Sequence, residues 1–123
     1  MIGYVTLGTA NLEAASQFYD ALMAELGGKR LWQFERGVAW GVSHDQPSLG
    51  LLTPFNGEAP TVGNGTMVAL RVATPDLVHK VHAKALELGA QNEGDVGPRG
   101  EGFYGGYFRD LEGHKLNVYC TQA

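Results

Sequence analysis

The chain has 123 residues, 44% of them hydrophobic and 18% charged, a composition that fits a single globular domain with a substantial core. A net charge of −4 at pH 7 gives no basic stripe for phosphates, so we expect no nucleic-acid partner, and no apolar run is long enough to suggest a membrane span. The single cysteine, Cys120, cannot form an internal disulfide and no apolar stretch follows a basic start, so we expect a cytoplasmic protein.

The first half of the chain is predicted to form a strand, a helix and three further strands. The segment GYVTLG alternates between apolar and other side chains, as a half-buried strand does. Asn11 is a good N-cap for a helix whose apolar residues recur at helical spacing, and Gly27 and Gly28 end it. Three strand-like runs follow, namely RLWQFE, VAWGVS and LGLLTP.

The same order of elements begins again after the loop FNGEAPTVGNG. The segment TMVALRV alternates like the first strand, Thr74 caps a second helix with Pro75 at its first position, and Gly89 stops that helix. The two helix ends even share letters, ALMAELGG at 21–28 and AKALELGA at 83–90. Further strand-like stretches follow at 91–97, 103–109 and 115–120.

The sequence therefore predicts an α+β fold of two βαβββ repeats within one domain, 1–123. The modules span about 1–57 and 65–121, and a linker of about 58–64 joins them. Each helix can cover only one face of its sheet, so we expect the two sheets to curve their uncovered faces around a shared cleft, with the helices outside. By alternation, the side chains lining this cleft would be Tyr4, Thr6, Met67, Ala69, Arg71, Asn117 and Tyr119.

Three segments on this repeated plan carry a family resemblance. They are YVTLGTANLEAASQFY at the start, MVALRVATPDL at the second repeat and YFRDLEGHKLNVY at the end. Together they resemble the vicinal oxygen chelate superfamily, which holds glyoxalase I, bleomycin-resistance proteins, fosfomycin-resistance enzymes and extradiol dioxygenases. The last segment looks like the family's DPDG turn and final strand, with Leu111 in place of proline. The resemblance covers nearly the whole chain and implies a homodimer.

In metal-using members of the superfamily, the first and fourth strands of each repeat supply the ligands of one divalent ion. The resemblance carries those positions onto Tyr4, Leu51, Met67 and Asn117. A phenol, an alkyl group, a thioether and an amide are poor ligands for zinc, nickel or ferrous iron, which prefer imidazole, carboxylate or thiolate. We therefore predict that the usual metal cofactor is absent.

The histidines are not expected to rebuild that metal site. His79 and His82 lie three residues apart on the second helix, and we expect them on a solvated flank opposite its apolar stripe. His44 is expected in a plain loop, and His114, the last residue of the turn, is expected to be exposed.

Aromatic side chains could either line the cleft or fill the core. The set consists of Tyr4, Trp32, Trp40, Phe103, Tyr107 and Tyr119, of which we place Trp40 among the ligand-binding residues. Tyr107 and Tyr119 have the better case because strand register could bring both near Asn117. A slip of one residue would instead direct Tyr104 and Phe108 inward.

Two arginines are candidates for ligand contacts. Arg71 could hold a carboxylate or phosphate by two parallel hydrogen bonds, or it could form a rim salt bridge with Asp76. Arg99, in the glycine-rich segment GPRGEG, could stand at the cleft entrance, where a solvated loop arginine is the alternative. Cys120 should face the helix as an inert buried thiol.

The sequence leaves two function classes open. The first is a metal-free protein that binds a small organic molecule in an aromatic cleft, as the resemblance to bleomycin-resistance proteins implies. The second is a lyase or isomerase related to lactoylglutathione lyase, either without a metal or with a shifted metal site. In that case Tyr4 would act as acid and base while Asn117 orients a carbonyl group, and the Tyr4 hydroxyl would need a nearby positive charge such as Arg71.

Overall fold

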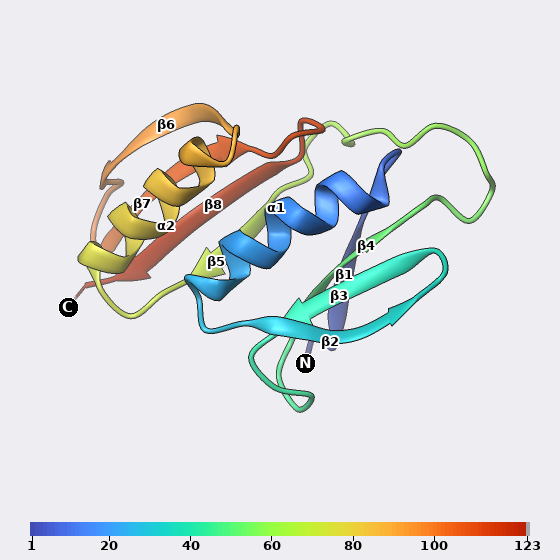
Figure 1. The fold of residues 1–123 in the computed structure, drawn as a ribbon. Helices are drawn as coiled ribbons and strands as arrows, with labels where there is room; N and C mark the ends of the chain where they lie inside the picture. Colours follow the sequence, from blue (N-terminus) through green and yellow to red (C-terminus); the bar gives the residue numbers. More distant parts are fainter. Residues whose placement is uncertain (123) are drawn as a thin grey trace. The chain divides into compact units, whose positions relative to one another are not determined.

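The computed structural model describes residues 1–122, which form two compact units, Met1–Val62 and a second unit that starts at Gly63. Each unit has one helix and one four-stranded sheet (Figure 1), so the predicted α+β class with two βαβββ repeats is confirmed. No helix among these residues is both long and apolar enough to cross a membrane.

The first unit is one complete repeat. Its elements are β1 (Tyr4–Gly8), α1 (Leu12–Ala24), β2 (Lys29–Phe34), β3 (Gly37–Gly41) and β4 (Ser48–Leu52). The strand order in the sheet is β1-β4-β3-β2, in which β1 runs parallel to β4 and the other pairs are antiparallel. The first strand therefore lies at one edge of the sheet, beside the last strand of its own repeat.

Helix α1 begins as its sequence predicts. The Asn11 side chain accepts a hydrogen bond from the Ala14 backbone N–H at 3.1 Å and so satisfies one of the free donors of the first turn. The apolar stripe of the helix then packs against one face of the sheet, and burial of each large side chain there contributes about 1.5–3 kcal/mol. The buried residues on this side include Leu7, Phe18, Tyr19, Leu22, Val38, Leu49 and Leu51.

The second unit repeats the plan of the first. Its elements are β5 (Val68–Arg71), α2 (Pro75–Glu87), β6 (Gln91–Pro98), β7 (Phe103–Arg109) and β8 (Lys115–Thr121). The strand order is β5-β8-β7-β6, with β5 parallel to β8. The Thr74 hydroxyl caps α2 by accepting from the Leu77 backbone N–H at 3.2 Å.

One histidine of α2 belongs to the core. His82 is buried because it follows Val78 by one helical turn and so falls on the apolar stripe. Its Nε2 lies 3.1 Å from the Tyr107 carbonyl oxygen, and its ring meets the Phe108 ring edge-on. The expectation of a solvated flank is therefore wrong for His82. His79 remains exposed, with its Nε2 2.7 Å from the Tyr104 hydroxyl.

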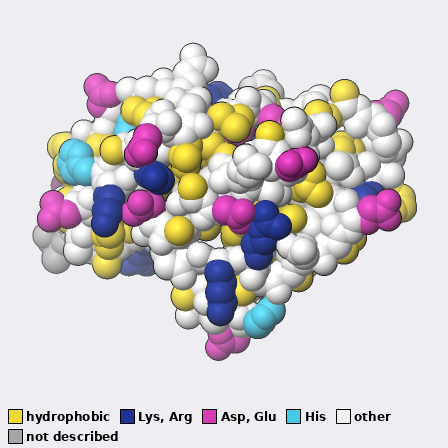
Figure 2. All heavy atoms as spheres, in the orientation of Figure 1, with side chains coloured by type: hydrophobic (Ala, Val, Ile, Leu, Met, Phe, Trp, Pro, Cys, Tyr) yellow, Lys and Arg dark blue, Asp and Glu magenta, His cyan; other side chains and the backbone are white. Residues whose placement is uncertain are grey.

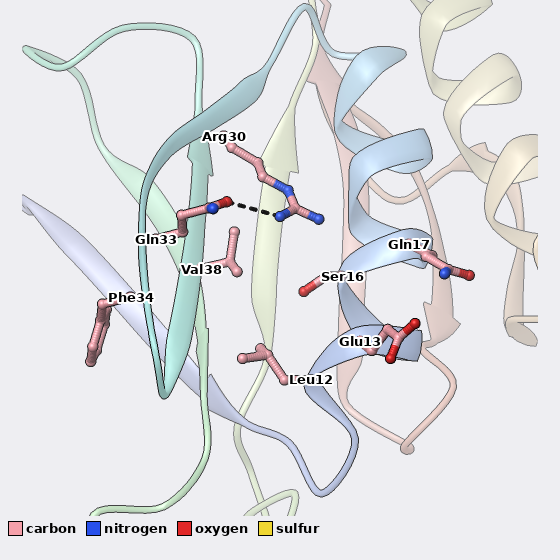
Figure 3. Close-up of a pocket in the computed structure, with 8 residues that line it drawn as sticks. All are labelled: Leu12, Glu13, Ser16, Gln17, Arg30, Gln33, Phe34 and Val38. Atoms are coloured by element: carbon pink, nitrogen blue, oxygen red, sulfur yellow. Dashed lines mark hydrogen bonds between the residues drawn. The ribbon is translucent and has the colours of Figure 1, made fainter.

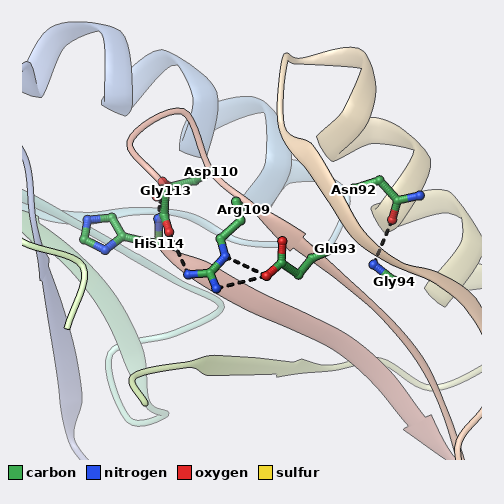
Figure 4. Close-up of polar contacts among 7 residues, drawn as sticks. All are labelled: Asn92, Glu93, Gly94, Arg109, Asp110, Gly113 and His114. Atoms are coloured by element: carbon green, nitrogen blue, oxygen red, sulfur yellow. Dashed lines mark hydrogen bonds and ion pairs between the residues drawn. The ribbon is translucent and has the colours of Figure 1, made fainter. Parts of the chain in front are cut away.

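The turn between β7 and β8 is held by polar contacts (Figure 4). The Asp110 carboxylate accepts from the His114 backbone N–H at 2.9 Å, and Gly113 adopts the left-handed region with φ 93°. Arg109 donates to the Gly113 carbonyl at 3.0 Å and to the Glu93 carboxylate at 2.9 Å, which lowers the Glu93 pKa. His114 is buried in this turn, so the expectation that it is exposed is wrong.

Candidate functional site

The helix-free face of the first sheet carries Tyr4 and Thr6. In the parallel pair of β1 and β4, Tyr4 is paired with Ser48 and Thr6 with Gly50, and paired residues point to the same side of a sheet. Leu51 follows Gly50 by one residue and therefore points to the opposite side of the sheet, where it is buried on the face that α1 covers. The assignment of Leu51 to the ligand-facing side is therefore wrong, because the short apolar run of β4 contains no alternation that could fix its register.

Trp40 also lies on the helix-covered face. It is only 1% exposed, its indole N–H donates to the Asp20 carboxylate at 2.8 Å, and its ring lies 5.6 Å from the Tyr19 ring. The placement of Trp40 among the ligand-binding residues is thus a wrong prediction. Trp32 is on the opposite face because it pairs with Ala39, after a register shift in β2 that the sequence does not show.

Three rings form a continuous row on the helix-free face of the first sheet, and we call them the aromatic row: Tyr4, Trp32 and Phe34. The Tyr4 and Trp32 centroids are 6.0 Å apart in an edge-to-face arrangement, and those of Trp32 and Phe34 are 5.7 Å apart. Gly50 lies directly beneath the Trp32 ring, since a Cβ atom at Gly50 would be 3.5 Å from that ring. Tyr4 is 61% and Phe34 50% exposed, so the row presents a large apolar surface.

A hollow of about 420 Å³ adjoins one end of this face. It lies where β1 and β4 end, and Thr6 and Leu52 line it together with the segment that follows β4. The residues around it include Thr6, Arg36, Leu52, Thr53, Phe55 and Pro60. Sequence reasoning assigned no role to Arg36 or Phe55, because neither lies in a recognisable motif.

A second hollow, of about 450 Å³, lies on the other side of the sheet, between α1 and β2 (Figure 3). Arg30 and Gln33 point toward the helix, whereas Phe34 points away from it. Arg30 donates two hydrogen bonds to Asp20, at 2.8 and 2.9 Å, and these bonds lower the Asp20 pKa. The Ser16 hydroxyl in this hollow is buried without a hydrogen-bond partner among the described residues.

On the helix-free face of the second sheet, the structure has the first of the two registers that the sequence left open. Asn117 pairs with Ala69 on one side and with Tyr107 on the other, and Arg71 pairs with Tyr119. These residues therefore share one face, as expected from alternation. The slipped register is excluded, since Phe108 contacts α2 instead.

Asn117 is embedded in its own sheet. It is 1% exposed, and its amide Nδ2 donates to the Gly106 carbonyl at 2.9 Å and, more weakly, to the Val118 carbonyl at 3.4 Å. Gly105 leaves room for the amide, because a Cβ there would lie 3.1 Å from Nδ2. The N–H donors of Asn117 thus hold the strands together, a role that the sequence did not reveal.

Cationic side chains and aromatic rings surround Tyr107 and Tyr119. Arg99 lies 5.6 Å and Lys115 5.3 Å from the Tyr107 ring centroid, and Arg99 also donates to the Asp95 carbonyl. Phe103 stacks on Tyr119 with the centroids 4.8 Å apart. The second unit therefore also presents an aromatic surface on its helix-free side.

The other two predicted residues of this face are more exposed. Arg71 donates to the Thr121 hydroxyl at 3.0 Å rather than to Asp76, and Met67 precedes β5 with its side chain partly in solvent. Arg71 is thus held by a neutral partner and keeps donors for a ligand.

The donor atoms at the family's metal positions do not fit a divalent ion. Tyr4 offers a neutral phenol, Met67 a thioether and Asn117 a neutral amide oxygen, whereas such ions prefer imidazole, carboxylate or thiolate. Residues of β4 on the same face as Thr6 offer no donor side chain at Gly50 or Leu52. Within residues 1–122, moreover, no cluster of three or more His, Cys, Asp or Glu side chains could hold a metal.

Several solved structures are similar to this chain. A glyoxalase/bleomycin resistance protein from Albidiferax ferrireducens T118 is 28% identical with a TM-score of 0.91, and the match covers 99% of each chain. A hypothetical protein from S. aureus is 26% identical with a TM-score of 0.75, over 98% of this chain and 92% of the other. A lactoylglutathione lyase from Agrobacterium tumefaciens shares the fold at 20% identity, with a TM-score of 0.71 over 98% and 92% of the chains.

A search of curated proteins found no match. The sequence model of the Glyoxalase/Bleomycin resistance protein/Dioxygenase superfamily, however, matches residues 1–118, nearly the full length. This match agrees with the fold, which has two βαβββ units and pairs the first strand of each unit in parallel with its last. The chain therefore belongs to the glyoxalase/bleomycin resistance protein/dioxygenase superfamily.

Proposed function

We propose that this protein binds a small planar or apolar organic molecule against the helix-free face of its first sheet, without a divalent metal. The observation that carries the proposal is the aromatic row, because folded proteins rarely leave contiguous rings in solvent unless a partner covers them. A stacked ring system gains about 0.5–1.5 kcal/mol per aromatic contact beyond the burial of its area.

The chemistry of the site favours binding over metal catalysis. The neutral donor set described above cannot offset the charge of a Lewis-acidic ion. Asn117 uses its N–H groups within the sheet, which leaves Oδ1, for which the described residues supply no hydrogen bond, to accept one from a ligand. The first sheet thus offers stacking surfaces and the second offers an amide acceptor, and both are features that small-molecule pockets use.

A screen of aromatic compounds by thermal shift, followed by calorimetric titration, tests this proposal. We expect at least one compound to stabilise the protein and Trp32→Ala to weaken its binding roughly tenfold, because the central ring of the row is lost. Val42→Ala serves as the control, since it removes an exposed apolar side chain that lies outside the aromatic row. Equal binding by Trp32→Ala and wild type would refute the site.

A glyoxalase assay provides the opposing outcome. Turnover of the hemithioacetal of methylglyoxal and glutathione that appears only after zinc or nickel is added would refute the metal-free proposal and favour the lyase alternative. Absence of turnover together with ligand stabilisation would support binding.

We also propose that the protein is a cytoplasmic homodimer without a nucleic-acid partner. Acidic and basic side chains are interspersed on the face shown in Figure 2, rather than gathered in a basic stripe. Light scattering should give about twice the 13.2 kDa mass of the chain, and a mass of one chain at micromolar concentration would contradict the dimer.

A further inference from the structure

The aromatic row continues into a cation. The Arg36 guanidinium carbon lies 5.8 Å from the Phe34 ring centroid and 5.4 Å from that of Phe55, so it sits between two rings. Its Nη1 donates to the Thr53 carbonyl at 2.8 Å, which fixes the position of the planar group. Phe55 is 93% exposed, and Arg36 itself is half-buried.

Arg36 has no carboxylate partner within residues 1–122, in contrast to Arg30 and Arg109. Arg30 is held by Asp20 and Arg109 by Glu93, each through hydrogen bonds of 3.0 Å or less. Arg36 instead contacts one neutral carbonyl and two rings. A guanidinium has five N–H donors, so most of those on Arg36 are available to a ligand.

The surroundings of Arg36 favour an anion. Arg36 and Thr6 both line the hollow of about 420 Å³ at the end of the helix-free face, and Arg36 also contacts Phe34, the ring of the aromatic row that neighbours Trp32. Two flanking rings keep water from part of the guanidinium, and a less hydrated cation gains more from a nearby anion. A carboxylate also matches the planar fork of an arginine through two parallel hydrogen bonds.

We propose that Arg36 binds the carboxylate of a small organic acid whose ring or apolar body lies along Phe34 and Trp32. The inference rests on the proposed function and specifies its ligand class as aromatic or apolar carboxylic acids. Because the guanidinium adjoins the Phe34 ring, the carboxylate is attached to the ligand's ring directly or through one carbon.

The test compares an acid with its neutral isostere. Wild-type protein is titrated with 2-naphthoate and with 2-naphthamide by calorimetry at low salt, with the fluorescence of Trp32 as a second signal. We expect the acid to bind about tenfold more tightly, the difference that a charge-assisted hydrogen bond supplies. Arg36→Gln should abolish the preference, so that acid and amide bind with similar affinity.

Lys29→Gln is the matched control, because it removes the same charge from an exposed position at the opposite end of β2. This variant should keep the tenfold preference for the acid. Arg36→Lys should keep only part of it, since an ammonium cannot form the two parallel bonds, and this variant decides the matter if Arg36→Gln does not fold.

The outcomes separate the two proposals. Equal binding of acid and amide by wild type, or an acid preference that survives in Arg36→Gln, would refute the role of Arg36 while the binding function stands. Failure of both compounds to bind wild type would refute the proposed function and, with it, the inference. An acid preference lost equally in Lys29→Gln would show general charge attraction and would also refute the role of Arg36.

Discussion

Replacing Asn117 by aspartate keeps the shape of the side chain but removes the N–H donor to the Gly106 carbonyl. At neutral pH the new carboxylate would be almost completely buried beside that carbonyl oxygen, since the position is 1% exposed. Burial and the adjacent oxygens should raise its pKa above the unfolded value, because both disfavour the charged form. A protonated aspartate can still donate to the Gly106 carbonyl, so the variant should lose less stability at acidic pH than at neutral pH.

The size of the effect follows from two contributions. The unsatisfied Gly106 carbonyl costs about 1–3 kcal/mol, and a pKa raised by about two units adds roughly 2.7 kcal/mol at neutral pH. When the pKa of a group is higher in the folded than in the unfolded protein, its stabilising contribution is complete below the unfolded-state pKa. That contribution is lost as the pH rises through the folded-state pKa. Asn117→Asp should therefore lose about 4 kcal/mol at pH 7.5 and much less near pH 4.

Urea unfolding at both pH values measures this difference. With a slope of about 1.5 kcal/mol per molar urea, the midpoint should fall by roughly 2–3 M at pH 7.5. Asn64→Asp, at an exposed loop position, is the control for the added charge and should leave the midpoint nearly unchanged. If Asn117→Asp were as stable as wild type at pH 7.5, the amide could not hold the strands as described.

Two further predictions concern stability. Because hydrogen bonds from Arg30 lower the Asp20 pKa from 3.8, the stability they add is present above that pH and is lost as the pH falls through the lowered pKa. Asp20→Asn should hence destabilise by up to about 1 kcal/mol at pH 7, and urea midpoints of variant and wild type should converge in strong acid; a constant gap would contradict this. In Gly105→Ala, the new Cβ would lie 2.8 Å from the Val118 carbonyl oxygen, so we expect a loss of about 1–3 kcal/mol in thermal unfolding. Gly3→Ala, where no atom lies within 4 Å, should have no such effect, and equal melting of the two variants would disprove the crowding.

The sequence predicted the repeat and both helix starts because the signals are local. Asn11 and Thr74 each satisfy a backbone donor three residues ahead, and the structure has both contacts. The alternation of β8 placed Asn117 and Tyr119 on one face, whereas the sequence FYGGYFR of β7 left two registers open, and only the structure pairs Tyr107 with Asn117.

The prediction of which side chains face the ligand side was wrong where the alternation along a strand was absent or interrupted. Leu51 lies in a run of apolar residues that reads equally well in two registers, and the shift in β2 puts Trp32, which the sequence did not single out, on the helix-free face. His82 was predicted to be solvated because a polar residue is expected to avoid the core. The structure buries it because the Tyr107 carbonyl provides a hydrogen-bond partner there. Arg36 gave no signal in the sequence, because two of its contacts, with Thr53 and Phe55, come from a later segment of the chain.

In both repeats the last strand completes the sheet by joining the first. Tyr4 is paired with Ser48 in one unit and Val68 with Leu116 in the other, so each closure spans most of its repeat and costs loop entropy. During synthesis, all strands of the amino-terminal repeat are outside the ribosome once Leu52 has emerged, while the strands of the second repeat are still inside the exit tunnel or not yet made. The first repeat can then fold alone, and a ribosome-stalled chain long enough to expose Leu52 should already resist proteolysis in its emerged part.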